Sequence, residues 1–406
     1  MDLFLSLGSI FLVGFGGGIL FEKIKLPKLI FYILLGILLG PSVLNFLDKT
    51  LLDIASYLRQ VALVIILTRS GLSLDFKTLK KIGRPAFLMC FLPAIMEIIG
   101  ISLLGPVILN ISIHESLLLG SVLAAVSPAV VVPRMIKLQN EGYGTNKHVP
   151  ELIMAGASCD DILVIVLFYS FKTLVKNNTF GVTSLLAIPL SIILGIILGF
   201  IFSFFISAIF KKLKLDTTLK IIILLGSSFL MIGIENILKP YISVSSLLAI
   251  LVTGMIILLK NEEDSINIKK CYDGLWQIFE ILLFVLVGAA FDVRYAFSFD
   301  GLKIILLLLI CLTFRSLGVF LCLFKTDYNF KERLFIILAY LPKATVQASI
   351  GAIALSEGLA CGNIILVAAV IAILICAPLG ALLIDKTYKK LLIKIDDLPI
   401  NQKEIA

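Results

Sequence analysis

Residues 151–173 read ELIMAGASCDDILVIVLFYSFKT, an apolar run with two adjacent aspartates, Asp160 and Asp161, near its middle. About 20 consecutive apolar residues cross the hydrocarbon core of a bilayer as one helix. A charge at that depth costs about 2.5–3.5 kcal/mol on insertion scales, so two charges there indicate a function. Neighbouring helical residues point about 100° apart. We therefore expect Asp161 to share a face with Ser158, and Asp160 to meet a basic neighbour.

The composition of the whole chain agrees with a membrane protein. Of its 406 residues, 60% are hydrophobic and 15% are charged, whereas soluble domains average about 45–50% and about 25%. This excludes a soluble enzyme, and spans of about 20 residues leave no room for a separate water-soluble domain. The net charge of +8 lies in short clusters between apolar runs, which indicates membrane topology and no nucleic-acid partner.

The apolar runs predict an all-α integral membrane protein with about thirteen transmembrane helices. They fall at 3–21, 28–47, 51–74, 84–106, 115–137, 151–173, 184–210, 217–238, 241–259, 274–292, 301–324, 331–357 and 361–384. With the N-terminus outside, 25 of the 35 Lys and Arg residues fall on the cytoplasmic side and 6 on the other. This bias predicts a multi-pass protein of the cytoplasmic membrane with its C-terminus inside. Residues 1–384 then form one transporter unit, and 385–406 form a short cytoplasmic tail.

Two of the predicted spans contain a proline in their middle. The span 115–137 contains Ser127-Pro128, and the span 331–357 contains Pro342-Lys343. Proline removes a backbone donor, and in lipid the freed carbonyls need partners in protein or in a water-filled cavity. These two spans cross the bilayer in opposite directions, which matches an inverted repeat of helices 1–6 and 8–13. Paired broken helices at corresponding positions of the two halves predict a transport site near the midplane.

Further charged residues lie at the level of the aspartates. Counting 1.5 Å per residue from the cytoplasmic side places Ser127, Arg315 and Lys343 roughly 14–18 Å deep, like Asp160 and Asp161. A carboxylate there that holds either a proton or a cation, but not both, makes the movement of cations across the membrane depend on the movement of protons. Two other acids have weaker claims. Glu280 lines an access route or forms a pair, and we expect Glu97 to pair with Arg59 on the preceding span.

Four motifs resemble those of monovalent cation:proton antiporters. They are Gly156-Ala157-Ser158-Cys159-Asp160-Asp161, the Ser127-Pro128 break, the Leu341-Pro342-Lys343-Ala344-Thr345 break, and the segment LPKLIFYILLGILLGP at 26–41. The resemblance covers nearly the whole chain. It implies a homodimer with a dimerisation domain, mainly helices 1–3 and 8–10. It also implies a core domain, mainly helices 4–6 and 11–13, that moves like an elevator. In that core, the two broken helices would cross beside the paired aspartates.

The same resemblance implies roles for individual residues. Asp161 would carry the ion and the proton, and Asp160 would be its partner. Ser158, with Val126 and Ser127 at the break, would supply further oxygens to the transported Na⁺.

The sequence departs from both branches of that family. The electroneutral branch usually has Thr-Asp-Pro at the first break and Asn-Asp on the next helix, whereas this chain has Val126-Ser127-Pro128 and Asp-Asp. The electrogenic branch has Asp-Asp but tends to place a lysine where this chain has Arg315. Arginine cannot deprotonate in proteins, so Arg315 can neutralise Asp160 but cannot carry a proton, while Lys343 could. The stoichiometry stays open at this point.

The sequence thus predicts a secondary antiporter that exchanges Na⁺, or Li⁺ or K⁺, for H⁺ by alternating access at a buried Asp pair, in pH homeostasis. It predicts no enzymatic activity and no cofactor, and its partners are the two ions, the lipid bilayer and a second copy of the chain. The alternative is a symporter of an organic anion, held by Lys343 and Arg315 between broken helices. An intramembrane hydrolase needs aspartates on two separate helices or an HExxH-type motif, and neither is present.

Overall fold

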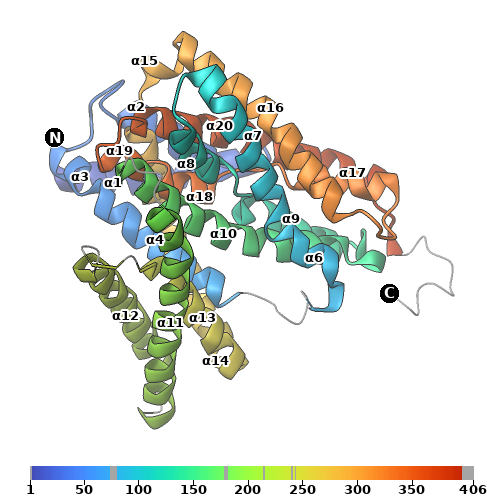
Figure 1. Cartoon of the computed structure of the whole chain (residues 1–406), viewed down its shortest axis with the longest axis horizontal. Helices are drawn as coiled ribbons and strands as arrows, with labels where there is room; N and C mark the ends of the chain where they lie inside the picture. The colour runs from blue at the N-terminus through green and yellow to red at the C-terminus, as the bar shows by residue number, and fades with distance from the viewer. Residues whose placement is uncertain are drawn as a thin grey trace. The chain divides into compact units, whose positions relative to one another are not determined.

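The computed structural model describes residues 2–73, 80–177, 182–213, 215–238, 241–242 and 244–395 (Figure 1). Residues 396–406 of the predicted tail lie outside these ranges. The described residues form helices and their connections, and the chain divides into two compact units. Unit 1 combines Met1–Ser56, Asp75–Phe171 and Phe284–Ala406, and unit 2 combines Tyr57–Leu74 with Lys172–Leu283.

Most helices belong to unit 1 alone. These are α1 (Leu3–Lys23), α2 (Lys28–Leu39), α3 (Lys49–Asp53), α6 (Arg84–Met89), α7 (Leu92–Leu109), α8 (Ile113–Leu123), α9 (Pro128–Asn140), the 3-10 turn η1 (Thr145–Lys147), α15 (Val293–Ala296), α16 (Phe299–Cys322), α17 (Phe330–Ala339), α18 (Thr345–Ile350), α19 (Ile353–Ser356) and α20 (Gly362–Leu391). Unit 2 contains α11 (Val182–Leu213), α12 (Thr217–Leu238) and α13 (Ser246–Lys260). Three helices have one part in each unit: α4 (Ala55–Gly71), α10 (Val149–Asn177) and α14 (Glu262–Ala289).

Within the described ranges, nine helices are long and apolar enough to cross a membrane. Shorter apolar helices lie at Lys28–Leu39, Ser246–Lys260 and Thr345–Ser356. The chain is therefore a helical membrane protein, as the composition predicts. The count of thirteen spans stays a prediction.

Several helices end elsewhere than the apolar runs predict. The run 28–47 ends as a helix at Leu39, because Gly40 precedes Pro41 and adopts an extended ψ of 174°, the conformation that a following proline favours. The run 84–106 is divided into α6 and α7, with Pro93 in the first turn of α7. At the C-terminal end, α20 continues to Leu391, so the predicted tail begins as helix.

Both proline-containing spans are interrupted. The chain leaves helical conformation between the end of α8 at Leu123 and the start of α9 at Pro128. It does so again between the end of α17 at Ala339 and the start of α18 at Thr345. Proline suits the first helical position because its missing N–H would be unpaired there anyway. The two interruptions contact each other in unit 1, where the Ser127 N–H donates to the Pro342 carbonyl at 2.8 Å.

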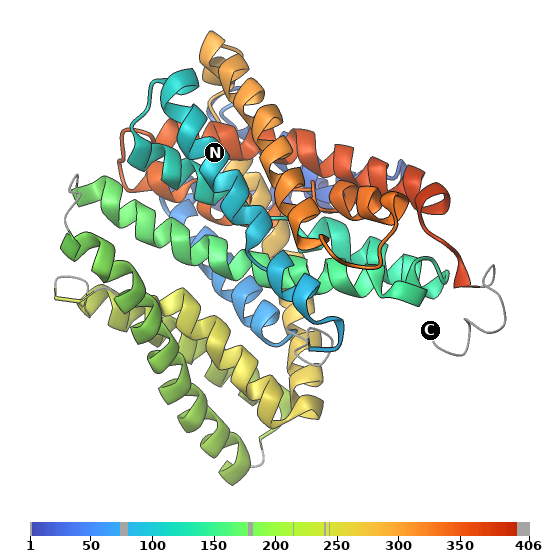
Figure 2. The ribbon, with the colours of Figure 1, turned by 45° about the vertical axis from the view of Figure 1, so that its right-hand side comes forward.

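Helix packing in each unit brings distant segments together. In unit 1, α7 packs against α16 and α8, and α17 runs beside the C-terminal part of α20 (Figure 1). In unit 2, α13 packs against α11 and α12 (Figure 2). Also in unit 1, α2 meets the end of α14 closely, because both helices have glycine at the contact. An added Cβ at Gly36 would lie 2.0 Å from the Val285 carbonyl oxygen, and one at Gly288 would lie 2.2 Å from that of Ile33.

The variant Gly288→Ala tests this contact. Its methyl group cannot fit against backbone without moving the helices apart, and such overpacking costs about 1–3 kcal/mol. Gly274→Ala on the same helix is the matched control, since no heavy atom lies within 4 Å of its added Cβ and alanine favours a helix. We expect denaturation of the purified protein in detergent to show a loss of stability for Gly288→Ala only. Equal stability of the two variants would refute the close contact.

Candidate functional site

Four buried charged side chains meet around the two interruptions in unit 1. Glu97 comes from α7, Asp160 from α10, Arg315 from α16 and Lys343 from the interruption after α17. Each is fully buried, at 0% exposure. Removing a charge from water is expensive unless it is paired and hydrogen-bonded, so the partners of each group decide what the cluster can do.

Arg315 is the centre of the cluster. Its Nη2 lies 2.9 Å from Asp160 Oδ2, and its Nη1 lies 3.1 Å from Glu97 Oε2. Its Nε donates to the Tyr340 carbonyl at 2.7 Å, and Nη1 also donates to the Ala124 carbonyl. The guanidinium therefore links two carboxylates to the backbone of both interruptions.

Lys343 completes the charge balance. Its Nζ lies 2.8 Å from the Glu97 carboxylate and also donates to the Leu123 carbonyl. Glu97 thus has two basic partners, Arg315 and Lys343. Two acids and two bases make a cluster with no net formal charge when all four are ionised.

The end of α8 explains why donors gather here. The last carbonyls of a helix have no partner within the helix, and at membrane depth they need one from the protein. The carbonyls of Leu123 and Ala124 accept from Lys343 and Arg315. Gln347 adds a neutral donor, with its Nε2 3.3 Å from the Leu123 oxygen and 3.0 Å from the Ala125 oxygen.

Asp161 differs from its neighbour Asp160. Asp160 Oδ2 accepts from Arg315 and, at 2.9 Å, from the Val126 N–H. Asp161 is 4% exposed, and its buried Oδ1 has no hydrogen-bond partner among the described residues. No basic side chain in that part of the chain forms an ion pair with it. Asp160 is thus neutralised by its surroundings, and Asp161 is not.

The structure places the remaining predicted site residues as follows. Ser158 Oγ donates to the Met154 carbonyl one turn earlier at 2.9 Å, so its lone pairs stay available. Ser127 is fully buried and lies just before the first residue of α9, Pro128, without capping the helix by its side chain. Glu280 lies on α14 within unit 2 and is buried there.

Several buried oxygen atoms around the two interruptions have no hydrogen-bond partner within the described residues. They include Ser127 Oγ, Asp160 Oδ1, Asp161 Oδ1, Thr345 Oγ1 and Gln347 Oε1. Such atoms are rare in folded proteins and need an explanation. Oxygen atoms of this kind are the ligands that hard cations prefer.

Three members of the site were not predicted from the sequence in these roles. Thr345 appeared only as part of the second break and Gln347 was not named, although the proline just before them is a signal that exposed backbone needs side-chain partners. Glu97 was assigned to a pair with Arg59, and its contacts with Arg315 and Lys343 were not predicted.

Comparison with known proteins agrees with this architecture. The sodium/hydrogen exchanger transmembrane family matches residues 8–385. Sodium/hydrogen exchanger 9B1 of Mus musculus is 35% identical over 402 residues, which cover 94% of this chain and 70% of that protein. Sodium/hydrogen exchanger 9B2 of Homo sapiens is 34% identical over 404 residues, with 94% and 73% covered.

A solved structure shares the fold. The sodium proton antiporter MjNhaP1 from Methanocaldococcus jannaschii, determined at pH 8, superposes with a TM-score of 0.82 and 21% identity, and the match covers 96% of this chain and 99% of that one. The family match and the relatives above 30% identity extend over nearly all of the chain. The chain therefore belongs to the sodium/hydrogen exchanger family, whose members are transporters and not enzymes.

Proposed function

We propose that this cation/proton antiporter exchanges Na⁺ for H⁺ by alternating access, with the Asp161 carboxylate as the group that both ions bind. Li⁺ and K⁺ are the other cations that such a site could carry. Family membership supports cation/proton antiport by a multi-pass membrane protein. The identity of the ion and the role of the Asp pair are our proposal.

The observation that carries the proposal is the charge balance of the buried cluster. Asp160 and Glu97 are matched by Arg315 and Lys343, whereas Asp161 is buried without a basic partner among the described residues. An ionised carboxylate in a low-dielectric site is strongly disfavoured without a counterion. Asp161 is therefore stable in that site with a bound proton or with a bound cation, and each excludes the other.

This balance also suggests a stoichiometry, which the sequence left open. A protonated Asp161 and a cation-bound Asp161 have the same net charge, so exchange at this group alone moves no net charge. Arg315 cannot release a proton, and Lys343 is engaged by Glu97 and the Leu123 carbonyl. We propose one cation for one proton. An exchange that moves a net charge differs greatly in energy from one that does not, since each net charge moved is worth about 2.3 kcal/mol per 100 mV.

Neighbouring oxygens would complete the cation shell. Ser158 precedes Asp161 by one helical turn, and Ser127 Oγ is buried without a partner among the described residues. Val126 already donates its N–H to Asp160, which leaves its carbonyl as a further candidate ligand.

The architecture around the site extends the proposal. We propose thirteen spans in an inverted repeat with crossed broken helices, the N-terminus outside and the C-terminus in the cytoplasm. We further propose a homodimer in which a core of helices 4–6 and 11–13 moves against a dimerisation domain of helices 1–3 and 8–10. This division groups helices by expected motion and differs from the contact units, which place α1 and α2 with α16 and α20.

The alternative, an organic-anion symporter, is not favoured. It requires Arg315 and Lys343 to hold the carboxylate of a substrate. Both side chains are already engaged with Glu97, Asp160 and backbone carbonyls, and the family match favours cation/proton exchange.

The variant Ser158→Ala tests the proposed cation shell. Loss of one oxygen ligand is expected to weaken apparent Na⁺ affinity about fivefold, the equivalent of about 1 kcal/mol, while the protonation of the site stays unchanged. The assay is Na⁺-driven proton flux in proteoliposomes with an internal pH dye. Ser170→Ala is the control, because Ser170 makes the same bond to the carbonyl one turn earlier on the same helix. Equal loss of Na⁺ and proton affinity in Ser158→Ala would exclude Ser158 as a cation ligand.

A further inference from the structure

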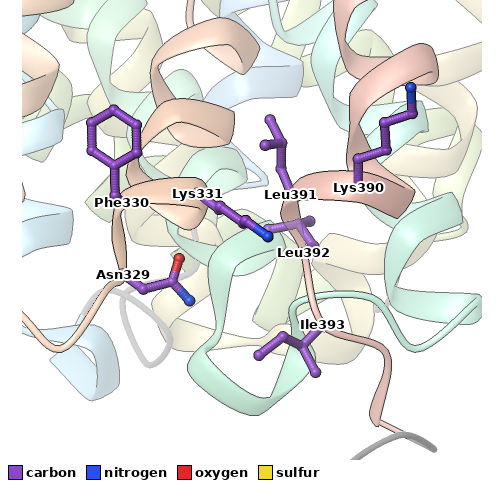
Figure 3. A pocket seen from close by; sticks show the side chains of 7 residues that line it. All are labelled: Asn329, Phe330, Lys331, Lys390, Leu391, Leu392 and Ile393. Atoms are coloured by element: carbon purple, nitrogen blue, oxygen red, sulfur yellow. The ribbon is translucent and has the colours of Figure 1, made fainter.

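A pocket of about 440 Å³ lies between the start of α17 and the end of α20 in unit 1. Lys331 and Lys390 supply its charged side chains, and Phe330, Leu391, Leu392 and Ile393 supply most of its apolar lining. Figure 3 shows Lys331 extending from α17 toward Leu392, and Lys390 leaving the last turn of α20. The pocket thus combines positive charge from two separate helices with an apolar floor.

The positive charge of this pocket is uncompensated. Neither Lys331 nor Lys390 forms an ion pair or a side-chain hydrogen bond in the part of the chain that the structure describes. The neighbouring acids have other partners, since Glu332 binds Lys147 at 2.9 Å and Asp385 binds Arg134 at 3.3 Å. An anion in the pocket would meet the ammonium group of Lys331 and no unpaired acid from these helices. The exposed Lys390 side chain points away from Lys331 in Figure 3, so it would turn toward the anion to add a second ammonium group.

The exposed faces of the two helices place the pocket at a membrane surface. On α20, exposed Leu379 and Leu382 are followed by exposed lysines in the last turns. On α17, Phe330 at 79% exposure and Leu334 at 36% flank Lys331. Exposed apolar side chains that give way to lysines are typical of a helix end passing from hydrocarbon into headgroups.

We propose that this pocket binds the headgroup of an anionic phospholipid, with Lys331 and Lys390 on the phosphate and an acyl chain along Phe330 and Leu334. Basic pockets between transmembrane helices suit such headgroups. A lipid fits better than a soluble phosphate, because only a lipid also covers the exposed apolar side chains beside the lysines. The bound headgroup joins the start of α17 to the end of α20.

The test is a lipid titration of the full chain in detergent, read by native mass spectrometry, with phosphatidylglycerol and phosphatidylcholine as probes. Near an anionic surface each lysine contributes about fivefold in affinity, so Lys331→Gln/Lys390→Gln should weaken phosphatidylglycerol binding about 25-fold. The matched control is Lys325→Gln/Lys389→Gln, which removes the same charge from lysines lying over Phe324 and Tyr388 outside the pocket. This control variant should bind phosphatidylglycerol as tightly as the unmodified protein does.

A third variant separates charge from folding. Lys331→Arg/Lys390→Arg keeps the charge and should retain phosphatidylglycerol binding. Equal weakening in the pocket and control variants would overturn the proposal, as would phosphatidylcholine binding as tight as phosphatidylglycerol. Displacement of the lipid by millimolar inorganic phosphate would also overturn it, because the site would then be one for a soluble anion.

Discussion

Proteoliposomes containing Asp161→Asn are expected to show no Na⁺-driven proton flux above that of protein-free liposomes. Asparagine keeps the shape of the side chain but binds no proton and offers no charge to a cation. The purified variant is expected to be at least as stable as the unmodified protein, because asparagine is always neutral, whereas the ionised form of Asp161 has no basic partner among the described residues. Activity is read with an internal pH dye, and stability by thermal denaturation in detergent.

Asp160→Asn is the matched comparison on the adjacent residue. Asp160 accepts from Arg315 and from the Val126 N–H, so its loss leaves a buried guanidinium without one of its counterions. That variant should lose activity. Its free energy of unfolding should also fall by about 3–5 kcal/mol, the cost of breaking a buried ion pair. Persisting flux in Asp161→Asn, or a stability loss equal to that of Asp160→Asn, would contradict the assignment.

The second large effect is expected from Glu97→Gln. Glu97 is the shared acid of Arg315 and Lys343, and all three side chains are fully buried. Neutralising it leaves two buried positive charges against Asp160 alone, and breaking a buried pair costs about 3–5 kcal/mol. The free energy of unfolding, measured by denaturation in detergent, should fall by that amount.

A second substitution distinguishes charge balance from simple misfolding. In Glu97→Gln/Lys343→Met the cluster again holds one acid, Asp160, and one base, Arg315. The double variant should be more stable than Glu97→Gln, although the Leu123 carbonyl loses the donor that Lys343 provides. A double variant destabilised by the sum of the two single effects would show that these residues do not form one unit.

The sequence predicted the helical membrane fold and the positions of both interruptions, because their causes are local. Apolar length defines a span, and proline removes a backbone donor wherever it stands. Helix ends were less predictable, since they depend on capping and packing. The end of α2 at Leu39 follows from Gly40-Pro41, whereas α20 continues through lysines to Leu391.

Depth counting explains which site residues were recognised. Asp160, Arg315 and Lys343 were counted from the same side of the membrane and came out at one level. Glu97 was instead expected to pair with Arg59 on the preceding span, and its contacts with Arg315 and Lys343 depend on helix packing that a residue count does not give. Gln347 was overlooked because a single uncharged amide in an apolar run does not stand out in the sequence. In the structure its Nε2 donates to the carbonyls of Leu123 and Ala125 at the end of α8.

Contacts between distant segments were beyond local reasoning. The end of the described chain pairs with the connection before α10, where Gly144 donates to the Ile393 carbonyl at 2.9 Å and Ile395 donates to that of Gly142 at 2.8 Å. Both glycines have positive φ, a conformation that glycine adopts without steric cost. The sequence marks such glycines as turns but does not say which segment they meet.

The central claim is that one carboxylate, that of Asp161, binds either Na⁺ or a proton. Its most direct test is the Na⁺ dissociation constant of the purified protein, measured at equilibrium across a pH series. Competition for one group predicts that the constant rises about tenfold for each pH unit on the acid side, with one proton released per Na⁺ bound. A dissociation constant that does not change with pH would contradict the account.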